Sequence, residues 1–160
     1  MRRTPVVCWV ALALFPALVP SCGVFEPEVG DPLPGCIDAD SDPNVPVSFK
    51  DQLRPLFAGT LPAPHPRPCA DCHYHSGGTM EGLQKGNLDL ETLGGLRNGG
   101  HFSQGTVAIP GKPCASPILQ KLRGTFEGPR MPKGGPYWSP AQIQLMSDWI
   151  FEGAIGASTD

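Results

Sequence analysis

The sequence predicts an all-α fold in which several short helices are joined by long loops. The chain has 20 glycines and 20 prolines among its 160 residues, and these two residue types interrupt helices and strands most often. No stretch shows the sustained alternation of polar and apolar residues that predicts a strand, whereas several short apolar segments follow a helix-capping signal. With 40% hydrophobic residues and three tryptophans, the chain can close one small core, so we expect a single domain.

Residues 1–21 have the pattern of a secretory signal peptide. Two arginines precede an apolar run over residues 6–19, which is shorter than the roughly 20 residues that a membrane-spanning helix needs. Residues 18–22 resemble a bacterial lipobox, in which the cysteine, here Cys22, becomes the lipidated mature N-terminus. We therefore expect export and lipid anchoring in the bacterial cell envelope, at the outer membrane facing the periplasm. Ordinary signal cleavage near Ser21 is the alternative.

Residues 22–46 combine prolines with acidic side chains and offer little to bury, so we expect a lipidated N-terminus followed by a flexible tether. Aspartates alternate from position 38 to 42 as in a calcium loop, but Pro43 stands where such a loop needs glycine, which favours a solvated linker. Removal of the signal peptide lowers the net charge from −3 to −5, because it carries two arginines and no acidic residue. A chain of this charge, without clustered Lys and Arg, is not expected to bind nucleic acid.

Residues 47–156 form the predicted domain, and its first helix begins after Ser48, which can cap it. The apolar residues that follow at helical spacing are Phe49, Leu53, Leu56 and Phe57. Pro55 lies inside this pattern and should kink or end the helix. A second short helix is expected over Leu88–Leu96, where two glycines at positions 99 and 100 would stop it.

Two later helices have clearer signals. Ser116 and Pro117 provide a cap and a proline at the first helical position, and the helix over residues 118–122 should end at Gly124. The residues Ser139 to Gln142 form a capping box that opens the last helix. Its apolar face is expected at Ile143, Met146, Trp149 and Ile150, with an end near Gly153. Loops this long argue against a domain packed only on itself, and a large apolar cofactor at the centre would supply the missing core.

Cys69-Ala70-Asp71-Cys72-His73 is the Cys-x-x-Cys-His attachment signature of c-type haem. In that chemistry the two thiols form thioethers with the two vinyl groups of the porphyrin, and the adjacent histidine ligates the iron. One alternative is a disulfide or redox pair at Cys69 and Cys72, although the βαβ context of a thioredoxin-like pair is absent. Another is a zinc site with His73 and His75, which lack the spacing of three to five residues between histidine ligands.

Further segments accompany this motif in a fixed order. They are Val47-Ser48-Phe49, Gly94-Gly95, Ile109-Pro110-Gly111, Ser116-Pro117-Ile118-Leu119, Arg130-Met131-Pro132 and the stretch from Ser139 to Ala154. Over about residues 47–155 the chain resembles the mono-haem cytochrome c domain of exported planctomycete and myxobacterial proteins. The resemblance implies a small cytochrome c-like fold, with short helices and long Gly/Pro-rich loops around one covalently attached haem c.

The resemblance also implies a distal iron ligand from a Met-Pro loop, and Met131 is the matching position. Its neighbours over residues 128–135 are mostly glycine and proline, so Met131 has no apolar helix face to fill. His101 is the alternative distal ligand, and ligation by two histidines would give a lower reduction potential than ligation by His and Met. Met80 is a weaker candidate for the same position. Met146 is expected in the core of the last helix.

Other residues have simpler expectations. His65 and His75 are expected to be solvated or hydrogen-bonded loop residues. Cys36 and Cys114 remain after the signal peptide, lipid and haem have taken the other four cysteines, and in an oxidising compartment two spare thiols predict a disulfide.

With His73 and Met131 on the iron, both axial positions are filled, and we expect an outer-sphere electron carrier with an unidentified redox partner rather than an enzyme. One alternative is a haem enzyme or small-ligand sensor with an open iron site. The other is a structural lipoprotein without haem, in which Cys69 and Cys72 form a disulfide or bind zinc.

Overall fold

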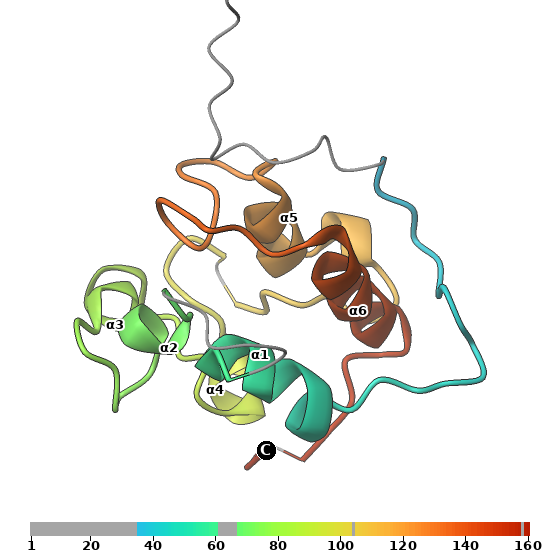
Figure 1. Cartoon of the computed structure of the whole chain (residues 1–160), viewed down its shortest axis with the longest axis horizontal. Helices are drawn as coiled ribbons and strands as arrows, with labels where there is room; N and C mark the ends of the chain where they lie inside the picture. Colours follow the sequence, from blue (N-terminus) through green and yellow to red (C-terminus); the bar gives the residue numbers. More distant parts are fainter. Residues whose placement is uncertain (1–34, 61–66, 104, 158) are drawn as a thin grey trace, which may run out of the picture.

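The computed structural model describes residues 35–60, 67–103, 105–157 and 159–160, and over these residues the chain is helical without a β-strand (Figure 1). The elements in chain order are η1 (Phe49–Leu53), α1 (Arg54–Ala58), α2 (Ala70–His73), α3 (Glu81–Gly86), α4 (Leu93–Asn98), η2 (Pro113–Ala115), α5 (Pro117–Arg123) and α6 (Pro140–Phe151). The predicted all-α fold is confirmed. Within the described ranges no helix is long and apolar enough to cross a membrane.

The first helical segment begins where the sequence predicts. The Ser48 hydroxyl accepts the Asp51 amide hydrogen at 3.1 Å, which caps η1. This first turn has π-type hydrogen bonding and passes into the α-helical α1 at Arg54. Pro55 therefore lies in the first turn of α1 and marks a change of helix type rather than an end.

The capping box of α6 is confirmed. Ser139 Oγ accepts the Gln142 amide hydrogen at 3.3 Å, and Gln142 Oε1 accepts the Ser139 amide hydrogen at 2.8 Å. The predicted end of α5 at the left-handed Gly124 is also confirmed. Ser116 does not cap α5, however, because its hydroxyl is used in the preceding loop, where it accepts from the Ile109 amide at 2.8 Å.

α4 begins later than predicted. It starts at Leu93, after Thr92 caps it through the Gly95 amide, and it ends at Gly99. The predicted first turn from Leu88 is not helical, because these residues pair with His73 instead. The short helices α2 and α3 have no counterpart among the helices predicted from sequence.

The core lies where α6 meets η1 and α5, and buried side chains of α1 and α4 belong to the same cluster. The Phe49 ring stands between Trp149, at 5.3 Å between centroids, and Phe57, at 6.0 Å. The Trp138 ring continues this stack 5.6 Å from Phe57. The side chains that are less than 2% exposed are Trp149, Phe49, Phe57, Leu53, Leu93, Leu96, Leu119, Met146, Ile150, Pro113 and Ser116. The helices therefore also pack on one another, in addition to whatever core a cofactor would supply.

The segment from residue 35 to residue 47 is extended but attached to the domain. It runs along the side that carries α6 (Figure 1). A disulfide joins Cys36 to Cys114, and the Ser41 amide and hydroxyl both donate to Asp148 of α6, at 3.0 and 2.5 Å. Any flexible tether is thus shorter than the predicted 22–46, because the backbone after residue 35 finds long-range partners.

Candidate functional site

One turn of helix carries Cys69, Cys72 and His73. The amides of Cys72 and His73 both donate to the carbonyl of Cys69, the N-cap of α2, at 3.2 and 2.9 Å, so the three side chains leave from one turn. Cys69 and Cys72 are half-buried free thiols and form no disulfide with each other. The Cys72 Sγ lies 3.3 Å from the Thr79 hydroxyl.

The state of the two thiols bears on the alternative chemistries. The Cys69 side chain packs against the core, and burial raises its pKa to about 12, which keeps the thiol protonated at neutral pH. Thiol redox chemistry uses the thiolate, so burial disfavours that role for Cys69. Among the residues that the structure describes, no three His, Cys, Asp or Glu side chains gather as a metal site, and the exposed His75 ring lies beside Asp89 instead.

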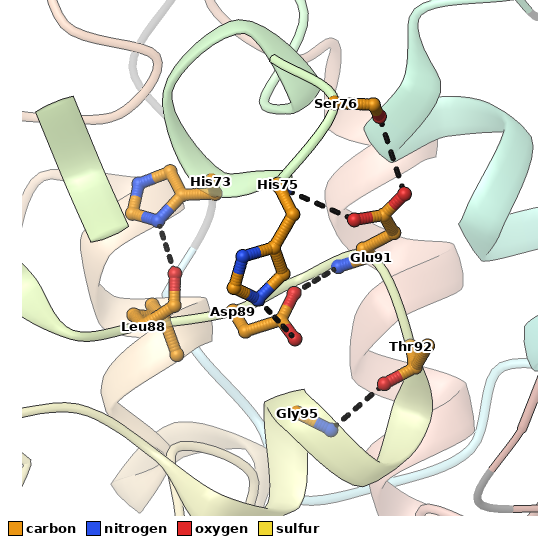
Figure 2. A network of polar contacts seen from close by, with 8 residues as sticks. All are labelled: His73, His75, Ser76, Leu88, Asp89, Glu91, Thr92 and Gly95. Carbon is orange, nitrogen blue, oxygen red and sulfur yellow. Dashed lines mark hydrogen bonds and ion pairs between the residues drawn. The ribbon is translucent and has the colours of Figure 1, made fainter. Parts of the chain in front are cut away.

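The imidazole of His73 is held at one nitrogen. Its Nδ1 donates to the Leu88 carbonyl oxygen at 2.8 Å (Figure 2), and its own carbonyl accepts the Leu90 amide hydrogen at 3.0 Å. Burial lowers the pKa of His73, with the Leu88 carbonyl and the Asp89 charge opposing this effect. The neutral imidazole therefore keeps its lone pair on Nε2, which is the form that ligates a metal.

α3 packs directly against this imidazole. A Cβ atom at Gly82 would lie 2.4 Å from His73 Cε1 and 2.6 Å from Nε2. Only glycine allows the helix backbone to come so close to the ring. Gly82 was not among the predicted site residues, and a lone glycine in a short polar segment gives no signal of such a contact.

Two carboxylates fix the segment that supplies the Leu88 carbonyl. Glu91 accepts from the His75 amide at 2.9 Å and from the Ser76 hydroxyl at 3.2 Å. Asp89 accepts the Glu91 amide hydrogen at 2.8 Å, and its other oxygen lies 3.6 Å from His75 Nε2 (Figure 2). The loop that follows His73 and the segment that holds its ring are thereby joined.

Met131 lies in a loop that is fixed on both sides. Its amide donates to the Lys121 carbonyl at the end of α5, at 3.0 Å, and its side chain is half-buried. Two residues later, the Lys133 carbonyl accepts from Arg67 Nη1 at 3.3 Å. Because Arg67 is two residues before Cys69, the structure brings the Met131 loop next to the segment that enters α2.

The other predicted ligands lie elsewhere. His101 is exposed, and its amide donates to the Gly86 carbonyl at 2.8 Å, beside the segment that holds His73 Nδ1. Met80 directly precedes α3, and its amide donates a hydrogen bond to the Asp71 carbonyl. Met146 is fully buried in the core. Cys22 and His65 lie outside the described residues.

Two free thiols and an oriented imidazole on one helical turn form an arrangement that suits the covalent attachment of a c-type haem. A family model described as planctomycete cytochrome C matches residues 69–135, from Cys69 through the Met131 loop. This match supports a cytochrome c-type domain, and with it haem c binding and electron transfer. The match covers less than half of the chain. No curated protein and no solved structure matches it.

Proposed function

We propose that the protein is an exported electron carrier with one covalently attached haem c. Cys69 and Cys72 would form the two thioethers, and His73 would ligate the iron through Nε2. The observation that carries this proposal is the His73 ring, which is partly buried on the same helical turn as the two thiols and already committed at Nδ1 to the Leu88 carbonyl. A haem c in this place supplies one-electron chemistry, and the chain supplies the axial ligands, the burial and the orientation.

Met131 is proposed as the distal ligand. Its backbone is fixed on α5, its side chain is not absorbed in the core, and its loop reaches Arg67 beside the attachment turn. His101 is a poorer candidate, since its backbone lies with the residues on the Nδ1 side of His73. His73 and Met131 together would hold the haem iron, and ligation by His and Met would raise the reduction potential and favour outer-sphere electron transfer over catalysis at the iron.

Export and lipid anchoring at Cys22 complete the proposal. The sequence of residues 1–22 supports both, and the Cys36–Cys114 disulfide is of a kind that persists in oxidising compartments such as the periplasm. The domain would then be joined to the membrane surface through residues 23–34. The redox partner would be a protein of the same compartment.

The test is an absorption spectrum of the full chain, exported in a host that matures c-type cytochromes. A covalently bound haem with a weak sulfur-to-iron band in the oxidised form is expected, and Met131→Ala should lose that band and keep the haem. Met80→Leu is the matched control and should keep the band. His73→Ala and Cys72→Ala should abolish normal haem incorporation. A colourless protein would overturn the proposal. Ready carbon monoxide binding by the reduced wild type would instead favour an open-site enzyme or sensor.

A further inference from the structure

The residue before Met131 has an unusually well-defined place. Arg130 Nε donates to the Leu122 carbonyl at 2.8 Å, while the Met131 amide donates to the Lys121 carbonyl at 3.0 Å. Two successive loop residues thus bind two successive carbonyls in the last turn of α5. Carbonyls in the last turn of a helix have no following helical turn to donate to them. The loop donates to the Leu122 carbonyl, and it adds a second donor to the Lys121 carbonyl, which also accepts from the Gly124 amide.

The rest of the Arg130 side chain lies between an aromatic ring and a glycine. Its guanidinium carbon is 4.2 Å from the centroid of the Tyr137 ring. On the other side, a Cβ atom at Gly124 would lie 3.2 Å from Arg130 Cδ and 3.3 Å from Cγ. Gly124 also has a φ of +75°, which favours glycine. The side chain is therefore held along most of its length.

We propose that Arg130 is a positioning residue for the Met131 thioether, an inference that rests on the proposed function. Arg130 directs its own side chain toward α5 and Tyr137, and in doing so it fixes the backbone from which the Met131 side chain leaves. Pro132, which follows Met131, is buried and restrains the other side. Without Arg130, the loop loses the bond to the Leu122 carbonyl and the contact with Tyr137. It keeps the Met131 amide bond to the Lys121 carbonyl and the Lys121 Nζ bonds to the Glu127 and Pro129 carbonyls. We expect the Met131 thioether to be held less firmly toward the iron.

Arginine is required here for its geometry rather than its charge. The Nε–H belongs to the planar guanidinium group at the point where the group joins the aliphatic chain. One side chain can therefore donate from Nε to Leu122 while the guanidinium carbon covers the Tyr137 ring. Lysine carries a single terminal ammonium and cannot do both. Arg130→Lys therefore keeps the positive charge but cannot make both the Leu122 bond and the Tyr137 contact. Tyr137→Leu removes the aromatic ring and leaves the arginine in place.

The experiment compares matured holoproteins: the wild type, Arg130→Lys, Arg130→Ala, Tyr137→Leu and Met131→Ala, with Lys133→Ala as the control that removes a charge from the same loop. The readouts are the sulfur-to-iron band of the oxidised form and the carbon monoxide affinity of the reduced form. In Arg130→Lys and Arg130→Ala the band should weaken, and the carbon monoxide affinity should rise about tenfold, because the open fraction rises by that factor. Tyr137→Leu should act in the same direction, and Lys133→Ala should match the wild type.

A double variant separates positioning from general stabilisation. If Arg130 acts through Met131, Arg130→Ala adds nothing to the carbon monoxide affinity of Met131→Ala. Equal effects in both backgrounds, or wild-type bands in Arg130→Lys and Tyr137→Leu, would overturn the proposal while leaving the axial ligand standing. A band that survives in Met131→Ala would instead reject the axial assignment, and with it the premise of this inference.

Discussion

His73 donates its Nδ1 hydrogen to the carbonyl oxygen of Leu88, a residue 15 positions further along the chain, at 2.8 Å. This bond selects the tautomer and fixes the plane of the ring. It depends on the close packing of α3 against the imidazole, since Gly82 leaves no space between them. A metal-ligating histidine commonly needs such a partner for its second nitrogen.

Gly82→Ala should therefore impair haem incorporation. The added methyl group would lie 2.4 Å from His73 Cε1, so either the ring or α3 must move and the bond to Leu88 is strained. The measurement is the yield of covalently bound haem per polypeptide. Gly86→Ala on the same helix is the matched control, because a Cβ there meets nothing within 4 Å. Normal haem yield in Gly82→Ala would show that the ring does not need this contact.

The Cys36–Cys114 disulfide should make a large contribution to stability. It joins residues 78 positions apart, and closing a loop of that length in the unfolded chain stabilises the fold by about 4–5 kcal/mol on the chain-entropy model. The double variant Cys36→Ser/Cys114→Ser should lose an amount of that order in urea unfolding of the holoprotein. Its haem spectrum should be unchanged, since neither cysteine is near α2 in sequence. A loss below about 1 kcal/mol would contradict the expectation.

Asp148 should secure the segment that precedes the first helix. Its carboxylate accepts from the Ser41 amide and hydroxyl and from Gln144, and hydrogen bonds to a charged group contribute about 1.5–3 kcal/mol each. Asp148→Ala should destabilise the protein by about 2–3 kcal/mol and expose residues 38–44 to limited proteolysis. Gln144→Ala, which removes only a donor on an exposed position, is the control. Unchanged cleavage in Asp148→Ala would show that the disulfide alone holds the segment.

Local signals in the sequence predicted much of the fold. The capping box from Ser139 to Gln142 and the stop at Gly124 depend on neighbouring residues, so their structures follow from short-range chemistry. The Cys-x-x-Cys-His motif is local for the same reason. The segment from Leu88 to Glu91 was wrongly predicted as helix. Its backbone forms hydrogen bonds with His73, and helix propensities, which depend only on local sequence, do not account for a partner so far along the chain.

Long-range partners explain the other differences. The Ser41 bonds to Asp148 span 107 positions, and the pairing of Arg67 with Lys133 spans 66, so neither could be found from local patterns. Gly82 and Arg130 act through contacts that become visible only when α3 and α5 are in place. The side chains that we propose for the chemistry could be named from the sequence, whereas the residues that we propose to position them could not.

Tyr74→Phe should stabilise the protein. The Tyr74 hydroxyl is buried and has no hydrogen-bond partner within the described part of the chain, and burial raises its pKa from 10.0 to about 12. Removing an unsatisfied buried hydroxyl should raise the free energy of unfolding by about 1 kcal/mol. The phenol ionises near pH 10.0 in the unfolded chain and near 12 in the folded one, so the wild type loses stability across this range and the variant lacks that loss. Urea unfolding of both holoproteins at pH 7 and above pH 10 measures the difference, with Tyr137→Phe as the control. A lower stability of Tyr74→Phe would show that the hydroxyl finds a partner, water or haem, in the matured protein.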